Sequence, residues 1–188
     1  MDKWSHKRAI MRNYDFTAPI YDVRYAEEQA AKIERALENV KVDNASLVLD
    51  CGCGTGLLFG YLADKVQAVV GLDFSRKILA MAKMLSKKFD NVYLVLADAD
   101  HVPFKNEVFT HVFAVTLLQN MPDPCETLTE IMRIAGEDAV VVVTGLKKKF
   151  SLNVFEDLLR KLGFKVDGIF NGSENLKCYV AVCTKSHG

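Results

Sequence analysis

The feature that most constrains the fold is a series of seven short apolar, strand-like runs, most of them separated by segments with helical periodicity. The first five runs are continuously apolar rather than alternating, as in strands that are buried on both faces. Strands of this kind, alternating with helices, indicate a parallel sheet covered on both sides. The expected strands are residues 47–49, 68–72, 92–96, 110–115, 139–143, 164–170 and 177–183.

Helical periodicity fills most of the intervals. Between residues 26 and 40, apolar residues recur every three or four positions and form one stripe, which is the pattern of a helix packed on a core. Ser75 is a plausible N-cap for the next strong pattern, and Gly163 stops the last one. The expected helices are residues 26–40, 57–65, 76–88, 125–134 and 152–162.

The C-terminal end departs from this alternation. Only residues 171–176 separate the last two strand-like runs. A helical crossover does not fit in so short a connection, so the two strands must be antiparallel. The predicted fold class is therefore α/β: a doubly wound, mostly parallel seven-stranded sheet that ends in a C-terminal antiparallel hairpin.

Length and composition favour one folded domain. The chain has 188 residues, of which half are hydrophobic, and its 24 basic and 24 acidic residues give zero net charge. This balance excludes a disordered chain and gives no global attraction to nucleic acid, although a local basic patch remains compatible with it. We expect a single domain over residues 1–188, with a helical cap over residues 1–40 and a core over residues 41–188.

The cysteines and the N-terminus carry little sign of secretion or metal binding. The five cysteines include no Cys-x-x-Cys pair and no cluster with zinc spacing, so reduced thiols and no metal site are expected. The first residues lack the apolar core of a secretory signal. No apolar run approaches the roughly eighteen residues that cross a bilayer. We therefore expect a cytoplasmic protein that does not bind membranes.

The sharpest motif is a glycine loop at residues 50–56, Asp-Cys-Gly-Cys-Gly-Thr-Gly, which follows the first strand and opens a helix. Such a loop lets a ligand approach the backbone, and the amides at the helix start favour a negative group. A phosphate-binding P-loop fails because Leu57 and Leu58 stand where Lys and Ser/Thr are needed. The spacing of the glycines differs from the dinucleotide-binding fingerprint, Gly-x-Gly-x-x-Gly, by one residue. For an isolated glycine cluster, a plain structural turn would be the better explanation.

A second signal favours a ligand-binding loop over a plain turn. Asp73 ends the next strand, about 20 residues after the first glycine. A carboxylate at this place commonly accepts both ribose hydroxyls of a nucleoside. An acid at a strand end is also a common helix cap, so Asp73 indicates a ligand site only in combination with the glycine loop before it.

With these motifs the sequence resembles the class I S-adenosylmethionine (SAM)-dependent methyltransferases, in their small single-domain, Rossmann-like form. The resemblance implies that residues 50–56 contact the methionine part of SAM, that Asp73 binds the ribose with Phe74 beside the adenine, and that Asp98 and Ala99 meet the adenine ring. The fourth-strand exit, which begins near Thr116, would line the methyl-transfer site. The cofactor-binding residues expected on this basis are Asp50, Gly52, Cys53, Gly54, Gly56, Asp73, Phe74, Asp98, Ala99, Thr116, Tyr14 and Tyr21.

The catalytic residues are less defined. Relatives often carry paired histidines after the fourth strand, where this chain has Gln119 and Asn120. Amides can orient an acceptor but cannot act as bases near neutral pH. The candidates are thus Gln119, Asn120 and, from an N-terminal element that would close over the cofactor, Tyr21. An acceptor that is already nucleophilic, or a base from elsewhere, fits this loop better than base-driven O-methylation.

The acceptor and the partners stay open at the level of sequence. Lys147–Lys149, together with basic residues near the N-terminus, could form a basic rim suited to RNA. No insertion large enough for a lid follows the fifth strand, which favours RNA or another bulky acceptor, such as a protein, over a small molecule. A partner subunit or a homodimer could complete the pocket. The alternatives are a SAM-binding scaffold subunit without its own catalysis and, third, a nicotinamide oxidoreductase.

Overall fold

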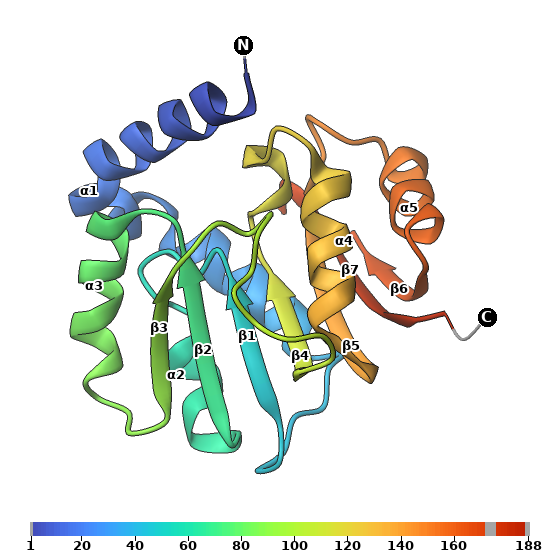
Figure 1. The fold of residues 1–188 in the computed structure, drawn as a ribbon, viewed down its shortest axis with the longest axis horizontal. Coiled ribbons are helices and arrows are strands. Elements are labelled where there is room, and N and C mark those ends of the chain that lie inside the picture. The colour runs from blue at the N-terminus through green and yellow to red at the C-terminus, as the bar shows by residue number, and fades with distance from the viewer. Residues whose placement is uncertain (1, 172–175, 187–188) are drawn as a thin grey trace.

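The computed structural model describes the backbone of residues 2–171 and 176–186, and their side chains apart from those of residues 13–25. Its strands form one seven-stranded sheet in the order β3-β2-β1-β4-β5-β7-β6. Figure 1 shows β1 to β4 with their carboxyl ends at the same edge. The strands are β1 (Leu47–Cys51), β2 (Ala68–Asp73), β3 (Val92–Leu96), β4 (Phe109–Ala114), β5 (Ala135–Leu146), β6 (Phe164–Phe170) and β7 (Cys178–Lys185).

Strand pairing confirms the predicted fold class. The pairs β1–β2, β1–β4, β2–β3 and β4–β5 are parallel. Strand β7 lies between β5 and β6 and is antiparallel to both, so the C-terminal hairpin enters the sheet with its second strand innermost. The strand order reverses between β1 and β4, and open α/β sheets bind ligands beside such a point.

Helices occupy the predicted intervals with shifted ends. They are α1 (Lys3–Leu37), α2 (Phe59–Leu62), α3 (Arg76–Ser86), α4 (Pro124–Ile134) and α5 (Leu152–Lys161), with short 3-10 turns at Ala63–Lys65 and Leu118–Asn120. Ser75 caps α3 as expected, because its hydroxyl accepts a hydrogen bond from the Ile78 amide at 3.1 Å. Asp123 caps α4, with Pro124 at the first helical position, where a missing N–H costs nothing. The predicted helix at residues 57–65 is shorter, because the glycine loop extends to residue 58.

Helix α1 is much longer than the apolar stripe at residues 26–40 indicated. Its N-terminal part carries no such stripe, so periodicity alone did not reveal it. Figure 1 shows that α1 changes direction part-way, so that its first part lies over the carboxyl edge of the sheet and its second part passes behind the strands. Pro19, within this helix, has no backbone N–H to donate, and a proline inside a helix commonly bends it.

The two faces of the sheet are covered by different helices. One core cluster joins the strands to α4 and α5 through Leu128, Ile131 and Phe155. The other joins them to α1, α2 and α3 through Ile33, Phe59 and others. Burial on both faces explains why the strands read as continuous apolar runs. Among the described residues, no helix combines the length and the apolar character needed to cross a bilayer.

Phe59 fixes the short helix α2 against the sheet. Its ring is fully buried and occupies the space that side chains on two glycines would need. A Cβ added at Gly71, in the middle of β2, would lie 2.6 Å from the Phe59 Cζ atom and 3.0 Å from Leu94 Cδ2. Contacts this short force neighbouring atoms to move, and a packed core resists such movement.

We expect Gly71→Ala to lower the free energy of unfolding by about 1–3 kcal/mol, the usual cost of overpacking a core. The matched control is Gly60→Ala on the exposed face of α2, where an added Cβ meets nothing within 4 Å. That variant should be neutral or gain up to about 1 kcal/mol of helix propensity. Urea denaturation of the three proteins measures both effects, and equal stabilities of the two variants would contradict the packing role of Phe59.

Candidate functional site

A cleft with an empty volume of about 1100 Å³, part of it open to solvent, lies at the carboxyl ends of β1–β4. Helix α1 forms one wall through Lys7, Ile10, Ala26, Gln29 and Ile33. The predicted site residues that line it are Asp50, Gly52, Cys53, Gly54, Asp73, Phe74, Asp98, Ala99, Thr116 and Asn120. Residues that are far apart in the sequence thus meet at the edge where the sheet topology predicts a ligand site.

The glycine loop is folded back over the end of β2. The backbone amides of Gly52 and Cys53 both donate to the Leu72 carbonyl, at 2.8 and 2.9 Å, and the Gly54 amide donates to Asp73 Oδ2 at 3.1 Å. Gly54 has a positive φ of 56°, and a Cβ added there would meet nothing within 4 Å. The loop therefore leaves open space above its backbone for a closely approaching ligand.

Gly56 has a different reason to be glycine. It does not line the cleft. A Cβ on it would lie 2.3 Å from the Phe59 ring, and its φ of 91° is left-handed. The third glycine of the motif is therefore explained by packing between the loop and α2.

Two carboxyl groups face the cleft beside this loop. Asp50 is only 4% exposed. Burial, and then the nearby Asp73 carboxylate, raise the pKa of Asp50 to about 8. Asp73 accepts hydrogen bonds from the Ser75 amide at 2.8 Å and from the Gly54 amide. A buried acid next to a second acid suits a ligand that brings positive charge, because that charge would favour the ionised form of Asp50.

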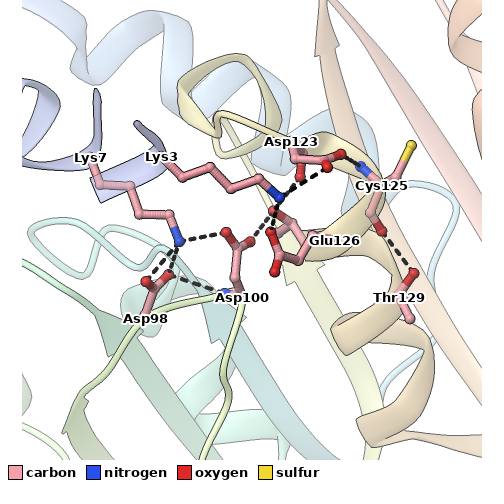
Figure 2. Close-up of polar contacts among 9 residues, drawn as sticks. Lys3, Lys7, Asp98, Asp100, Asp123, Cys125, Glu126 and Thr129 are labelled. Carbon is pink, nitrogen blue, oxygen red and sulfur yellow. Dashed lines mark hydrogen bonds and ion pairs between the residues drawn. The ribbon is translucent and has the colours of Figure 1, made fainter. Parts of the chain in front are cut away.

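The adenine end predicted for the cleft holds an ion-pair cluster (Figure 2). Lys7 Nζ, from the second turn of α1, donates to Asp98 Oδ1 and Oδ2 at 2.8 and 2.7 Å and also contacts Asp100 Oδ2. Thr127 donates to the other Asp100 oxygen. Asp98 thus lines the cleft with both oxygens already in contact with a lysine. An adenine amino group would share or replace that contact.

Lys3 makes a second, exposed bridge one turn earlier. Its ammonium lies 3.2 Å from Asp123 Oδ2 and 2.7 Å from Glu126 Oε2 at the start of α4. Figure 2 shows the two lysines side by side, each reaching from α1 to an acidic group on the body of the protein. These contacts hold the N-terminal part of α1 across the cleft.

The basic rim expected for RNA is not assembled by the described residues. Lys3 and Lys7 are paired with acids. Lys147 donates to the Asn171 carbonyl at 3.0 Å, and Lys149 donates to the Gln119 carbonyl at 2.6 Å. The lysines after β5 therefore hold neighbouring loops in place, and only Lys148 of the three has no such bond among the described contacts.

The fourth-strand exit brings one of the two amide candidates into the cleft. Asn120 lines it, and its amide donates to the Thr116 carbonyl at 2.9 Å. Gln119 does not line it, and its side-chain oxygen is buried with no hydrogen-bond partner among the described residues. The side chains of Tyr14 and Tyr21 lie outside the described part of the structure, so their proposed roles stay predictions.

Few of the described residues that line the cleft carry a titratable group. Its described titratable lining consists of Lys7, Asp50, Cys53, Asp73 and Asp98. Burial raises the pKa of the Cys53 thiol well above its ordinary value, which leaves it protonated and unreactive. The fourth-strand exit contributes the apolar side chains of Val115, Leu117 and Met121 to the lining.

Sequence reasoning missed Gln29 and Lys32 on α1, and it assigned Lys7 only to a basic rim. Gln29 and Lys7 line the cleft, and Lys32 is buried behind it. Gln29 and Lys32 interrupt the same helix face as Ile33 and Ala36. Polar residues within a buried helical face were the available signal, because such groups are buried only when they have partners.

Comparison with known proteins agrees with this geometry. Residues 49–143, about half of the chain, match the family model described as a methyltransferase domain. The chain belongs to the class I SAM-dependent methyltransferase family. It is 30% identical over 146 residues to a malonyl-[acyl-carrier protein] O-methyltransferase of Marinomonas sp., covering 77% of this chain and 54% of that protein. It is 35% identical to a demethylmenaquinone methyltransferase of Lactiplantibacillus plantarum, covering 58% and 48%.

Solved structures of the same fold include two that cover nearly all of this chain. A Haloferax volcanii methyltransferase, in complex with the Trm112 methyltransferase activator, has a TM-score of 0.81 at 18% identity and covers 93% of this chain and 98% of its own. The magnesium protoporphyrin IX methyltransferase of Synechocystis, with bound SAM, has a TM-score of 0.79 at 17% identity and covers 99% and 98%. The chain spans about half the length of the curated relatives it matches.

We expect SAM binding by this methyltransferase-family chain to depend on the protonation of Asp50. The folded-state pKa of about 8 exceeds the ordinary 3.8, so the carboxyl stabilises the SAM-free protein at low pH and loses that contribution as the pH rises through 8. SAM carries an ammonium and a sulfonium, which favour the carboxylate, so binding should release a proton and tighten between pH 6 and 7.5. Calorimetry in buffers of different ionisation enthalpy measures that proton.

Asp50→Asn separates this effect from other titrations. The variant should unfold at a higher temperature than the wild type at pH 8.5 without SAM, because no buried charge forms. It should also bind SAM more weakly and without the pH dependence. Asp64→Asn, at an exposed acid away from the cleft, is the control. An unchanged pH dependence of SAM binding in Asp50→Asn would contradict the assignment.

The two lysine bridges of α1 should differ in strength. The Lys7 side chain is 8% exposed, whereas that of Lys3 is 56% exposed. Removing one partner of a buried ion pair leaves uncompensated charge, so we expect Lys7→Met to cost about 3 kcal/mol of unfolding free energy. Lys3→Met should cost less than about 1 kcal/mol, as is usual for surface pairs. Urea denaturation measures both variants. If Lys7→Met and Lys3→Met lose the same free energy of unfolding, the Lys7 cluster is as solvated as the Lys3 bridge.

Proposed function

We propose that this chain transfers a methyl group from SAM to a small organic acceptor whose reacting atom is already nucleophilic. The observation that carries the proposal is a single cleft whose lining brings the glycine loop, Asp50 and Asp73 together with an apolar fourth-strand exit, where Leu117 lies against the glycine loop. When bound, SAM supplies a methyl group on a positively charged sulfur.

The proposed roles follow the order of residues along the cleft. Asp50, Gly52, Cys53 and Gly54 would hold the methionine end by charge and by close approach to the backbone. Asp73 would bind the ribose with Phe74 next to it, and Asp98 and Ala99 would meet the adenine. Thr116 would lie at the methyl end, where the side chains of Leu117 and Met121 help to exclude water.

The acceptor class follows from the described residues of the fourth-strand exit. None of those that line the cleft titrates, so an acceptor that is held there and must lose a proton would find no partner for it among them. Asn120 can orient such an acceptor without removing its proton. The relatives named for malonyl-[acyl-carrier protein] and demethylmenaquinone favour organic acceptors over RNA.

A scaffold function is the second candidate. The similar Haloferax volcanii methyltransferase is described in complex with an activator protein. By analogy, this chain would either need a partner subunit or a second copy of itself for catalysis, or act only as the SAM-binding member of a pair. The arrangement of the glycine loop, Asp50 and Asp73 supports catalysis over scaffolding, because a scaffold has no need of a ligand cleft.

The proposal predicts that the purified protein binds SAM and transfers its methyl group to a component of cell extract that organic solvent extracts. Protein should be incubated with methyl-labelled SAM and fractionated extract, and the products divided into solvent-extractable, ribonuclease-sensitive and protease-sensitive label. Asp73→Ala should lower the rate of methyl transfer at least tenfold, because it removes one strong charge-assisted contact with the ribose.

The other outcomes are informative in different ways. Label that ribonuclease or protease releases would contradict a small acceptor and support RNA or protein. SAM binding without any transfer would favour either a scaffold function or a missing partner protein. Adding the proteins of the cell extract back to the assay distinguishes the two, because only a missing partner would restore transfer. A protein that binds no SAM would contradict the proposal as a whole.

A further inference from the structure

The least expected charge in the molecule is the buried ammonium of Lys32. This residue, on the C-terminal part of α1, is only 2% exposed. Its Nζ lies 3.1 Å from Glu28 Oε1 and donates to Thr116 Oγ1 at 3.1 Å. The buried Cys178 thiol on β7 also interacts with it. The ion pair with Glu28 compensates the charge, and the contact with Thr116 links α1 to the end of β4.

Thr116 has a backbone conformation that its side chain disfavours. Its φ is 62°, in the left-handed region, which β-branched residues rarely adopt. Such strain persists only where surrounding contacts impose it, and it is frequent at functional sites. The energetic cost here falls on a residue that lines the cleft.

Four hydrogen bonds hold Thr116 in this conformation. Its amide donates to Thr144 Oγ1 at 2.7 Å, and its carbonyl accepts from Asn120 Nδ2 at 2.9 Å. Its hydroxyl donates to Gln29 Oε1 at 2.7 Å and accepts from Lys32. Two of the four partners belong to α1, so this helix, which also covers the cleft, fixes the turn at the fourth-strand exit.

The turn at Thr116 determines where the next residues lie. Leu117 returns to the glycine loop, where its Cδ1 lies 3.0 Å from the position of a Cβ on Gly52. Asn120 is oriented by its bond to the Thr116 carbonyl. A relaxed Thr116 would turn this carbonyl away and release the Asn120 amide from its present direction.

We infer that Lys32 is a positioning residue for methyl transfer: through the Thr116 hydroxyl it holds the left-handed turn that orients the Asn120 amide and the Leu117 side chain at the methyl end of the cleft. The role in catalysis rests on the proposed function, whereas the control of the turn stands without it. Lys32 does not line the cleft and acts only through Thr116.

The test uses side-chain and backbone amide signals in nuclear magnetic resonance spectra of the full chain without SAM. Asn120→Asp identifies the Asn120 side-chain signal by its loss. We expect Lys32→Met and Thr116→Val each to shift this signal and the backbone signals of residues 116–121. Thr116→Val replaces the hydroxyl, which bonds both Gln29 and Lys32, and leaves the Glu28–Lys32 pair intact. It therefore tests the control of the turn by α1 even where Lys32→Met does not fold. Thr116→Ser, which keeps the hydroxyl, is the control.

A rescue experiment separates positioning from simple anchoring of α1. Glycine adopts a left-handed turn without strain. Adding Thr116→Gly to Lys32→Met should therefore return the backbone signals of Leu117 and Asn120 toward their wild-type positions. An anchoring role predicts no such return, because glycine restores no contact with α1. Unshifted Asn120 signals in Thr116→Val would overturn the inference.

SAM labelled with carbon-13 at the methyl group connects the turn to the proposed function. Lys32→Met should change its affinity by less than about threefold, because Lys32 does not line the cleft. Thr116→Val alters a residue of the cleft itself, so its affinity is measured but decides nothing. The bound methyl resonance should nevertheless move in both variants, and a bound methyl signal identical to wild type in both would contradict the catalytic part of the inference. A wild-type protein that binds no SAM counts against the proposed function alone, since the spectra without SAM still decide the role of Lys32.

Discussion

The cleft depends on one backbone oxygen, the Leu72 carbonyl at the end of β2. By accepting hydrogen bonds from both the Gly52 and the Cys53 amides, it draws the chain that leaves β1 across the neighbouring strand. Along that path Gly52, Gly54 and Gly56 are left-handed, and the Gly54 amide donates to Asp73. Pairing of β1 with β2 brings Asp50 and Asp73 near each other, and burial first and the Asp73 carboxylate second raise the pKa of Asp50. The loop that the Leu72 carbonyl holds thus lies beside both acids of the site.

Helix α1 completes the site from outside the sheet, and it does so with two lysines held by acids. Burying an ammonium is costly unless partners replace its water. Lys7 meets this condition with Asp98 and Asp100, and Lys32 meets it with Glu28. Contacts of this type define position more sharply than apolar packing, because each ammonium needs its partner oxygens at hydrogen-bond distance. The helix is therefore placed with respect to both the adenine end and the fourth-strand exit.

The sequence sufficed for the sheet, its hairpin and the glycine loop because each depends on local pattern. Continuous apolar runs, the spacing of three glycines and the position of Asp73 are all readable within some twenty residues. The α1 contacts were not readable, since the partners Lys7 and Asp98 are 91 positions apart and Lys32 and Thr116 are 84 apart. The sequence pattern also left structural reasons unseen. Packing against Phe59 is reason enough for a glycine at position 56, and two of the lysines after β5 are bonded to neighbouring loops.

The distribution of charge along the cleft limits the chemistry that it can support. Acidic groups gather where a cation would bind, and the described residues near the methyl end offer apolar surface and one oriented amide. A low-dielectric surrounding strengthens the pull of Asp50 and Asp73 on a positively charged ligand. The same surrounding would penalise a charged acceptor that arrived without a partner. Strain at Thr116 fits this division, because it keeps the polar Asn120 amide in place at the one point where an otherwise apolar wall must orient a reactant.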